Sequence, residues 1–136
     1  MIISVGINNI NEIVNILKEK ISSKDLIILL QGTLASGKTT LVKKYVESVG
    51  LDTSVTSPTF SIQSIYGDNI YHYDMYNKTL EEFVSLGLLE EFENSGVHFV
   101  EWGSDDLKSI LLDYGFDVMS IKIEKKDNKR EYKIES

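Results

Sequence analysis

The chain has 136 residues and a formal net charge of −7, and it contains no cysteine. One domain is expected at this length, and the missing cysteines exclude disulfide frameworks, thiol catalysis and cysteine-ligated zinc. The acidic balance argues against a protein that binds nucleic acid by itself, because such binding needs cations that neutralise phosphates. The longest apolar run, Leu26–Leu30, is far shorter than the roughly 20 residues of a membrane helix. We therefore expect a single cytoplasmic domain over 1–136 and no membrane partner.

Hydrophobic periodicity divides the first half of the chain into alternating strands and helices. Apolar residues at helical spacing follow Asn9, which together with Glu12 resembles a capping box at a helix start. The unbroken apolar run after this helix is typical of a strand buried on both faces of a parallel sheet. The next helix is expected to end at Gly50, because glycine suits the left-handed conformation behind a helix. The predicted elements are strands at 2–5 and 26–30 and helices at 9–21 and 38–49.

The second half of the chain predicts two hairpins with helices between them. Gly67–Asp68 and Asp127–Asn128 are turn signals, each between two strand patterns. Thr79, followed by Glu82, and Ser104 are expected N-caps of helices. Alternating strands and helices early in the chain, with later hairpins, predict an α/β fold whose parallel core has antiparallel edges. The predicted elements are strands at 61–66, 69–76, 97–102, 118–123 and 129–134 and helices at 79–92, interrupted at Gly87, and 104–114.

A phosphate-binding pattern, G-x-x-x-x-G-K-[ST], occupies residues 32–39 between a predicted buried strand and a predicted helix. Its glycines let backbone N–H groups point at phosphate oxygens, and the helix start adds the positive end of its dipole. In such a loop the lysine reaches the β- and γ-phosphates and the hydroxyl binds Mg²⁺. Thr40 also fits an ordinary position in the first helical turn. The predicted nucleotide-binding residues of this segment are Gly32, Thr33, Leu34, Ala35, Ser36, Gly37, Lys38, Thr39 and Thr40.

A phosphate loop needs acidic residues on neighbouring strand ends to complete the Mg²⁺ shell and to place the attacking water. Two predicted strands end on an acid, at Asp74 and Glu101, and the residues alone leave open which one binds the metal. His72 shares a strand face with Asp74, so it either orients that carboxylate or fills a semi-polar face. His98 has no carboxylate at a helpful spacing and is expected to be structural. Thr59 either contacts the γ-phosphate or metal-bound water, as a switch threonine does, or belongs to a turn that opens a strand.

The last segment of the chain is basic. Residues 121–136 hold six basic and four acidic residues, so this tail is either a solvated hairpin or a surface for an anionic ligand or RNA. It contains Arg130, the only arginine of the sequence. Phosphoryl-transfer enzymes often use an arginine to stabilise transition-state charge, so this chain has little of that charge to supply in cis.

The motifs G-T-L-A-S-G-K-T-T, S-P-T-F, Y-H-Y-D-M-Y, L-G-L and V-E-W, in this order, resemble the bacterial TsaE (YjeE) family of small P-loop ATPases. The resemblance covers nearly the whole chain and implies a P-loop NTPase-like three-layer α/β sandwich with a mixed, mainly parallel central sheet. It also implies ATP or ADP with Mg²⁺ as ligands and a supporting role in making threonylcarbamoyladenosine in tRNA. The implied partners are TsaD and TsaB, with tRNA reached only indirectly through their complex. Family members are weak ATPases alone, and hydrolysis resets the complex between turnovers.

The same resemblance implies roles for individual residues. The metal ligands correspond to Thr39 and Glu101, while Asp74 is a candidate for positioning the attacking water. The switch threonine corresponds to Thr59, and the segment near Asn8 aligns with contacts on the adenine side. The remaining positions that match family residues without an assigned role are Trp102 and Arg130.

Several positions depart from the family pattern. Thr33, Ala35 and Ser36 replace the usual loop residues, and Asn77 stands where the family's D-x-Y-R motif has its arginine. Ligand charge near that point would be met by Lys38, by Mg²⁺ or by a partner's side chain. Two alternatives therefore stay open beside the ATPase, namely a nucleotide-gated, non-catalytic interaction module and a small-molecule kinase.

Overall fold

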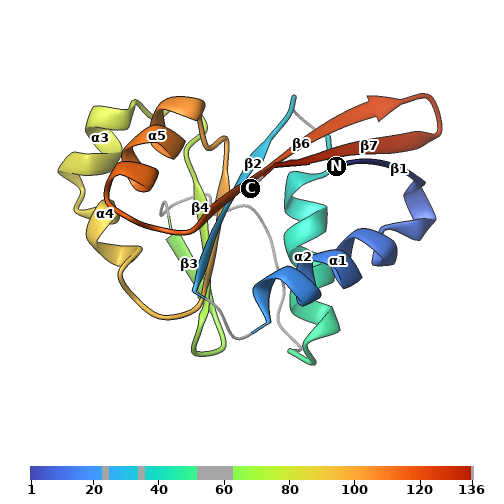
Figure 1. Ribbon diagram of the computed structural model, residues 1–136, viewed down its shortest axis with the longest axis horizontal. Helices are drawn as coiled ribbons and strands as arrows, with labels where there is room; N and C mark the ends of the chain where they lie inside the picture. The colour runs from blue at the N-terminus through green and yellow to red at the C-terminus, as the bar shows by residue number, and fades with distance from the viewer. Residues whose placement is uncertain (23–24, 34–35, 52–62, 136) are drawn as a thin grey trace.

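The protein is described by a computed structural model for residues 1–22, 25–33, 36–51 and 63–135. Within these residues one mixed sheet has the strand order β1-β7-β6-β2-β5-β4-β3 (Figure 1). The four central strands, β6, β2, β5 and β4, are parallel, while the remaining strands add antiparallel edges. The strands are β1 (Ile2–Gly6), β2 (Leu26–Gln31), β3 (Gln63–Tyr66), β4 (Ile70–Asp74), β5 (Val97–Glu101), β6 (Val118–Lys126) and β7 (Lys129–Glu135).

Helices cover both faces of the sheet, so the fold has three layers. Figure 1 shows α1 and α2 on one side of the sheet and α3, α4 and α5 on the other. Each side has its own apolar core, and residues of β2 contribute alternately to the two. Among the helices described, none has the length and hydropathy of a membrane span. The helices are η1 (Ile7–Asn9, a 3-10 turn), α1 (Asn11–Ile21), α2 (Lys38–Ser48), α3 (Leu80–Ser85), α4 (Leu88–Glu91) and α5 (Asp105–Asp113).

The central strand explains why a run of five apolar residues is tolerated in the sequence. Ile28 and Leu30 pack into the core under α1 and α2, while Ile27 and Leu29 pack into the core under α3, α4 and α5. Both faces of β2 are thus removed from water, as expected for a central strand of a covered parallel sheet. The predicted α/β fold with a mixed sheet and a parallel centre is confirmed.

The start of the first helix differs from the prediction. Residues 7–9 form a 3-10 turn, and the N-cap of α1 is Ile10, which makes no side-chain cap hydrogen bond. The predicted capping box of Asn9 and Glu12 is therefore wrong, because Asn9 belongs to the preceding turn. The carbonyl of Ile10 instead accepts hydrogen bonds from the backbone N–H groups of Ile13 and Val14.

The later helix signals are confirmed. Thr79 and Glu82 form a reciprocal capping box, and the Ser104 hydroxyl accepts a hydrogen bond from the Leu107 N–H at 3.1 Å. The predicted helix over 79–92 is divided into α3 and α4 at Gly87, which has a φ of +75°. Strand β6 extends beyond the predicted end at residue 123, because its pairing with β7 continues to Lys126.

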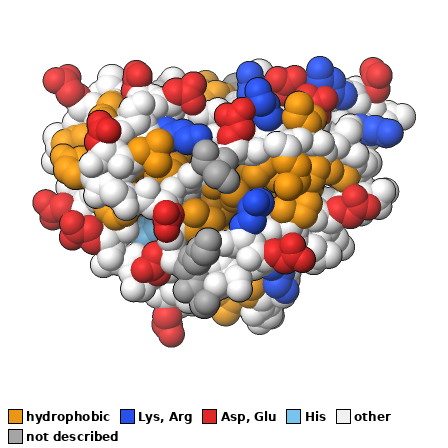
Figure 2. All heavy atoms as spheres, in the orientation of Figure 1, with side chains coloured by type: hydrophobic (Ala, Val, Ile, Leu, Met, Phe, Trp, Pro, Cys, Tyr) orange, Lys and Arg blue, Asp and Glu red, His pale blue; other side chains and the backbone are white. Residues whose placement is uncertain are grey.

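The predicted C-terminal hairpin is also confirmed, and its cations are interleaved with acidic side chains. The ammonium groups of Lys122 and Lys126 lie 3.6 and 3.5 Å from carboxylate oxygens of Glu124, and that of Lys133 lies 3.3 Å from Glu135. Figure 2 shows Lys and Arg side chains mixed with Asp and Glu over this hairpin, at the upper right of the molecule. These ion pairs favour the solvated-hairpin interpretation of the basic tail.

Candidate functional site

Nine of the sequence-predicted site residues meet at the carboxyl edge of the parallel strands. A pocket of about 380 Å³ lies there, beside the start of α2 and the ends of β4 and β5. The convergence follows from the topology, since parallel strands present their carboxyl ends at the same edge of a sheet. The residues that line the pocket are Ser36, Gly37, Lys38, Thr39, Thr40, Asp74, Tyr76, Glu101, Trp102 and Arg130.

Lys38 opens α2 and is folded back onto its own loop. Its ammonium group donates to the carbonyls of Gly32 and Thr33, each at 2.8 Å, and lies 3.4 Å from the Ser36 hydroxyl. Burial lowers the pKa of this ammonium, and the nearby carboxylates of Glu101 and Asp74 oppose that shift. Three donors with three oxygen neighbours keep a buried cation hydrogen-bonded.

Trp102 forms one wall around Lys38. The ammonium nitrogen lies 3.9 Å from the centroid of the Trp102 ring, within the range of a cation–π contact. Trp102 has a φ of +64°, an uncommon conformation for a bulky residue. This turn directly follows β5 and carries the ring over Lys38, while Tyr76 packs on Trp102 with ring centroids 5.0 Å apart.

Glu101, rather than Asp74, is hydrogen-bonded to the loop threonine. The Thr39 hydroxyl lies 2.9 and 2.8 Å from the two carboxylate oxygens of Glu101. The carboxylate is 3% exposed, so it is removed from water beside a hydroxyl that could share a ligand with it. Asp74 is half-buried at the end of β4, in register with Glu101, and its Oδ1 accepts a hydrogen bond from the Tyr76 N–H at 2.9 Å.

This oxygen pair suits a magnesium ion. Mg²⁺ prefers octahedral oxygen ligands at 2.0–2.1 Å, so two adjacent ligands should be about 2.8–3.0 Å apart. The Thr39–Glu101 oxygen distances fall in that range. Mg²⁺ is also usually bound through one or two carboxylates together with substrate phosphates, which the adjoining phosphate loop could supply.

His72 occupies a place that neither sequence-based interpretation anticipated. Its Nε2 lies 2.5 Å from Oε2 of Glu101, and its Nδ1 lies 3.1 Å from the Tyr66 hydroxyl. His72 thus contacts the metal-ligand candidate rather than orienting Asp74 or merely filling a face. The alternation of the strand places His72 on the same face as Asp74. Its contact with Glu101 also depends on the register between β4 and β5.

His98 is structural, as predicted. It stacks on Tyr71 with ring centroids 4.3 Å apart, and its nitrogens lie 2.7 Å from the Tyr73 hydroxyl and 2.8 Å from the Asn94 carbonyl. Burial lowers the pKa of this imidazole. The ring belongs to an aromatic cluster on the face covered by α3, α4 and α5.

The sole arginine reaches the phosphate loop from the far end of the chain. Arg130 Nε donates to the carbonyl of Ser36 at 3.1 Å. This contact needs β7 beside β6 and β6 beside β2, a strand order that places the C-terminal hairpin next to the loop.

Three of the described residues in the prediction, Asn8, Gly32 and Thr33, do not line this pocket. Asn8 lies in η1 with an exposed side chain and is not among the lining residues. Leu34, Ala35 and Thr59 lie outside the described residues. Gly32 and Thr33 contribute through their carbonyls to Lys38.

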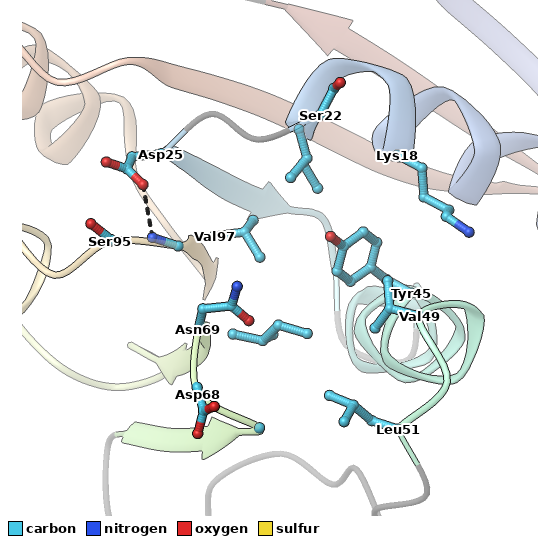
Figure 3. A pocket seen from close by; sticks show the side chains of 14 residues that line it. Lys18, Ser22, Asp25, Tyr45, Val49, Leu51, Asp68, Asn69, Ser95 and Val97 are labelled. Carbon is cyan, nitrogen blue, oxygen red and sulfur yellow. Dashed lines mark hydrogen bonds between the residues drawn. The ribbon is translucent and has the colours of Figure 1, made fainter.

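A larger pocket, of about 660 Å³, lies at the opposite, amino edge of the parallel strands. Figure 3 shows Tyr45 of α2 and Val49, which directly follows α2, facing Asn69 and Val97 across this space, with Lys18 at its rim. None of the described residues that line it belongs to the phosphate loop or to the acidic strand ends. Residues 36–39 of the phosphate-binding pattern and the acidic strand ends line the smaller pocket instead.

A family model and two curated relatives all match the same family. A family model described as "Threonylcarbamoyl adenosine biosynthesis protein TsaE" matches residues 6–133. The chain is 39% identical over 80 residues to the tRNA threonylcarbamoyladenosine biosynthesis protein TsaE of Treponema pallidum, and 42% identical over 79 residues to that of Bacillus subtilis. These alignments cover 57% and 56% of this chain and 59% and 49% of the two relatives. The matched stretch thus spans only about half to three-fifths of those relatives.

A solved structure extends the likeness over nearly the whole chain. The crystal structure of Bacillus subtilis YdiB is similar with a TM-score of 0.63 and 28% sequence identity. The superposition covers 97% of this chain and 83% of that structure.

Proposed function

Because the chain belongs to the TsaE family, we propose that it is a Mg²⁺-dependent, ATP-binding and ATP-hydrolysing component of tRNA N6-threonylcarbamoyladenosine biosynthesis. The observation that carries the proposal is the convergence of Lys38, Thr39 and Glu101 in one pocket. A lysine, a hydroxyl and a buried carboxylate beside a phosphate loop are the groups that a metal–nucleoside triphosphate needs.

Phosphate binding would change the partners of Lys38. In the structure its ammonium donates to two backbone carbonyls of the loop. Phosphate oxygens are anionic acceptors, and charge-assisted hydrogen bonds are about twice as strong as neutral ones. The N-terminus of α2 and the backbone N–H groups of the loop would supply the rest of the phosphate cradle.

Thr39 and Glu101 would hold the magnesium ion. When bound, Mg²⁺ neutralises charge on the phosphates and helps orient them for attack. The buried Glu101 carboxylate is fixed by hydrogen bonds before any metal arrives, so little reorganisation is needed. Thr39 lies in α2, which follows β2 in the chain, and Glu101 ends β5, which is paired with β2. Both residues therefore lie at the same edge of the sheet.

Asp74 is the proposed group for positioning the attacking water, with Thr59 as the proposed switch residue. Asp74 reaches the pocket from the strand adjacent to Glu101, which suits a role next to the metal rather than on it. Arg130 also reaches the pocket, but its Nε is engaged with the Ser36 carbonyl. A partner's side chain is therefore expected to complete the site, and we propose TsaD and TsaB as partners in the cytoplasm, with tRNA contacted through them.

ATP hydrolysis by this chain alone and with TsaB and TsaD, each with and without Mg²⁺, tests the proposal. Turnover of the isolated chain should be far below the rate of about 10 s⁻¹ that is typical of self-sufficient enzymes. It should rise when both partners are present and vanish when the metal is chelated. Failure to bind ATP would refute the proposal, while binding without stimulated hydrolysis would favour the nucleotide-gated module.

A further inference from the structure

Two buried tyrosine–histidine pairs lie on opposite faces of the sheet. On the face covered by α1 and α2, the Tyr66 hydroxyl lies 3.1 Å from Nδ1 of His72. On the other face, the Tyr73 hydroxyl lies 2.7 Å from Nδ1 of His98. The two pairs are similar in burial and chemistry, but they differ in what the second imidazole nitrogen contacts.

The second nitrogen of His72 contacts a carboxylate, whereas that of His98 contacts a backbone carbonyl. His72 Nε2 lies 2.5 Å from Oε2 of Glu101, and His98 Nε2 lies 2.8 Å from the carbonyl of Asn94. A carboxylate oxygen only accepts hydrogen bonds, so Nε2 of His72 donates to it. Nδ1 of the same ring then accepts a hydrogen bond from the Tyr66 hydroxyl.

We propose that His72 and Tyr66 are positioning residues that hold the Glu101 carboxylate in the orientation that binds Mg²⁺. This inference rests on the proposed function, because it assigns a role toward the metal of that site. The interactions run in one line from the pocket to the interior, through Thr39, Glu101, His72 and Tyr66.

His72 and Thr39 contact the Glu101 carboxylate from different sides. His72 is completely buried and approaches Oε2 from the interior, while Thr39 approaches both oxygens from the pocket. The bond from His72 therefore does not occupy the position between Thr39 and Glu101 that suits the ion. A buried carboxylate without such a donor would be free to rotate, and a rotated carboxylate weakens a metal site.

The test compares the magnesium dependence of nucleotide binding in matched variants. Binding of β,γ-imido-ATP is measured by calorimetry over a range of Mg²⁺ concentrations and in EDTA, using the full chain. The variants are Tyr66→Phe, His72→Gln and His72→Leu, and the controls are Tyr73→Phe and His98→Gln. Each control removes an equivalent buried bond from the opposite face of the sheet.

The proposal gives a graded expectation. His72→Leu should lower the apparent Mg²⁺ affinity by about 10-fold or more, in the range seen when residues that orient metal ligands are replaced. His72→Gln should lose less, because its amide keeps an N–H donor near the position of Nε2. Tyr66→Phe should lose roughly threefold, as expected for one hydrogen bond. Nucleotide affinity in EDTA should stay unchanged in all three variants.

Each other outcome contradicts the proposal in a recognisable way. Wild-type Mg²⁺ dependence in His72→Gln and Tyr66→Phe, together with a merely lower melting temperature, would show that the pair is structural. An equal loss in Tyr73→Phe or His98→Gln would trace the effect to general loosening of the core. If the nucleotide affinity of the wild type does not depend on the Mg²⁺ concentration, the proposed metal site is refuted, and this inference is refuted with it. If His72→Leu does not fold, Tyr66→Phe decides, since it removes only one hydroxyl.

Discussion

Arg130 and Ser36 are 94 residues apart in the chain, yet the guanidinium Nε of one donates to the carbonyl of the other at 3.1 Å. The contact ties the C-terminal hairpin to the phosphate loop. A basic residue that composition alone would assign to a solvated hairpin therefore also contacts the loop of the proposed nucleotide site. The same hairpin position lies opposite Lys125, whose side chain is exposed.

Replacing Arg130 should weaken nucleotide binding even though the residue is remote in sequence. We expect Arg130→Ala to raise the Kd for ATP by about 3- to 10-fold, because the loop loses a hydrogen bond from a charged donor. Lys125→Ala removes the same charge from the paired position and should change the Kd by less than twofold. Calorimetric titration of both variants checks this, and equal effects would mean that only the charge of the hairpin matters.

Removal of the Lys38 ammonium should abolish measurable nucleotide binding. Lys38 is 5% exposed, and its ammonium group donates to two carbonyls of its own loop. Lys38→Ala is expected to lose at least about 100-fold in ATP affinity, since charge-assisted phosphate bonds are lost in a partly buried site. Lys43→Ala, at an exposed position of the same helix, is the control. Retained ATP binding in Lys38→Ala would indicate a decayed phosphate loop or a different ligand.

The two carboxylates should separate binding from turnover. Glu101→Ala is expected to abolish the Mg²⁺-dependent part of nucleotide binding, because the hydroxyl of Thr39 loses the carboxylate beside it. Asp74→Ala should keep Mg²⁺-dependent binding and lower partner-stimulated turnover by about 100-fold, the lower range for a group that handles the attacking water. Binding titrations and single-turnover hydrolysis measure the two effects. Normal stimulated turnover in Asp74→Ala would remove this residue from the mechanism.

The convergence of the site could be predicted from the sequence, whereas its internal contacts could not. The phosphate-loop pattern and the acids at the ends of apolar strands place Lys38, Asp74 and Glu101 at one edge, because parallel strands end together. The contact between His72 and Glu101 depends on which strands are neighbours and in which register, and periodicity does not carry that information. The approach of Arg130 depends in the same way on the strand order.

The predicted N-caps are correct where the chain enters the helix from an extended residue, and wrong where a 3-10 turn precedes the helix. At Thr79 and Ser104 the chain enters the helix from an extended residue, so the capping side chains reach the first turn. At Asn9 a 3-10 turn comes first and moves the start of α1 by two residues, which removes the side chain from the capping position. Asn9 and Thr79 are each followed three residues later by a glutamate, but the backbone conformation at the helix start differs between them.

Gly32 should be needed for stability as well as for phosphate binding. Its φ is +143°, and an added Cβ would lie 2.5 Å from the carbonyl oxygen of Ile123 and 2.7 Å from the Ser36 hydroxyl. Gly32→Ala is therefore expected to lower the free energy of unfolding by about 2–4 kcal/mol, from backbone strain and the forced movement of β6. Gly115 also has a positive φ, of +88°, but the carbon added in Gly115→Ala would meet open space. Urea unfolding should show a loss of only about 1 kcal/mol there, and equal losses would mean that strain alone accounts for the effect.

His98 should make the folded state sensitive to acid. Burial lowers the pKa of this imidazole from its usual 6.5, so over the pH range just below 6.5 the unfolded chain binds more protons than the folded one. The free energy of unfolding rises with pH wherever the unfolded state holds more protons, so stability should fall as the pH drops through this range. Urea unfolding at several pH values between 7.5 and 5 measures the slope. His98→Gln cannot titrate, so its slope should be shallower than that of the wild type even though the variant is less stable at pH 7.5. Parallel slopes for the two proteins would show that another group controls the acid response.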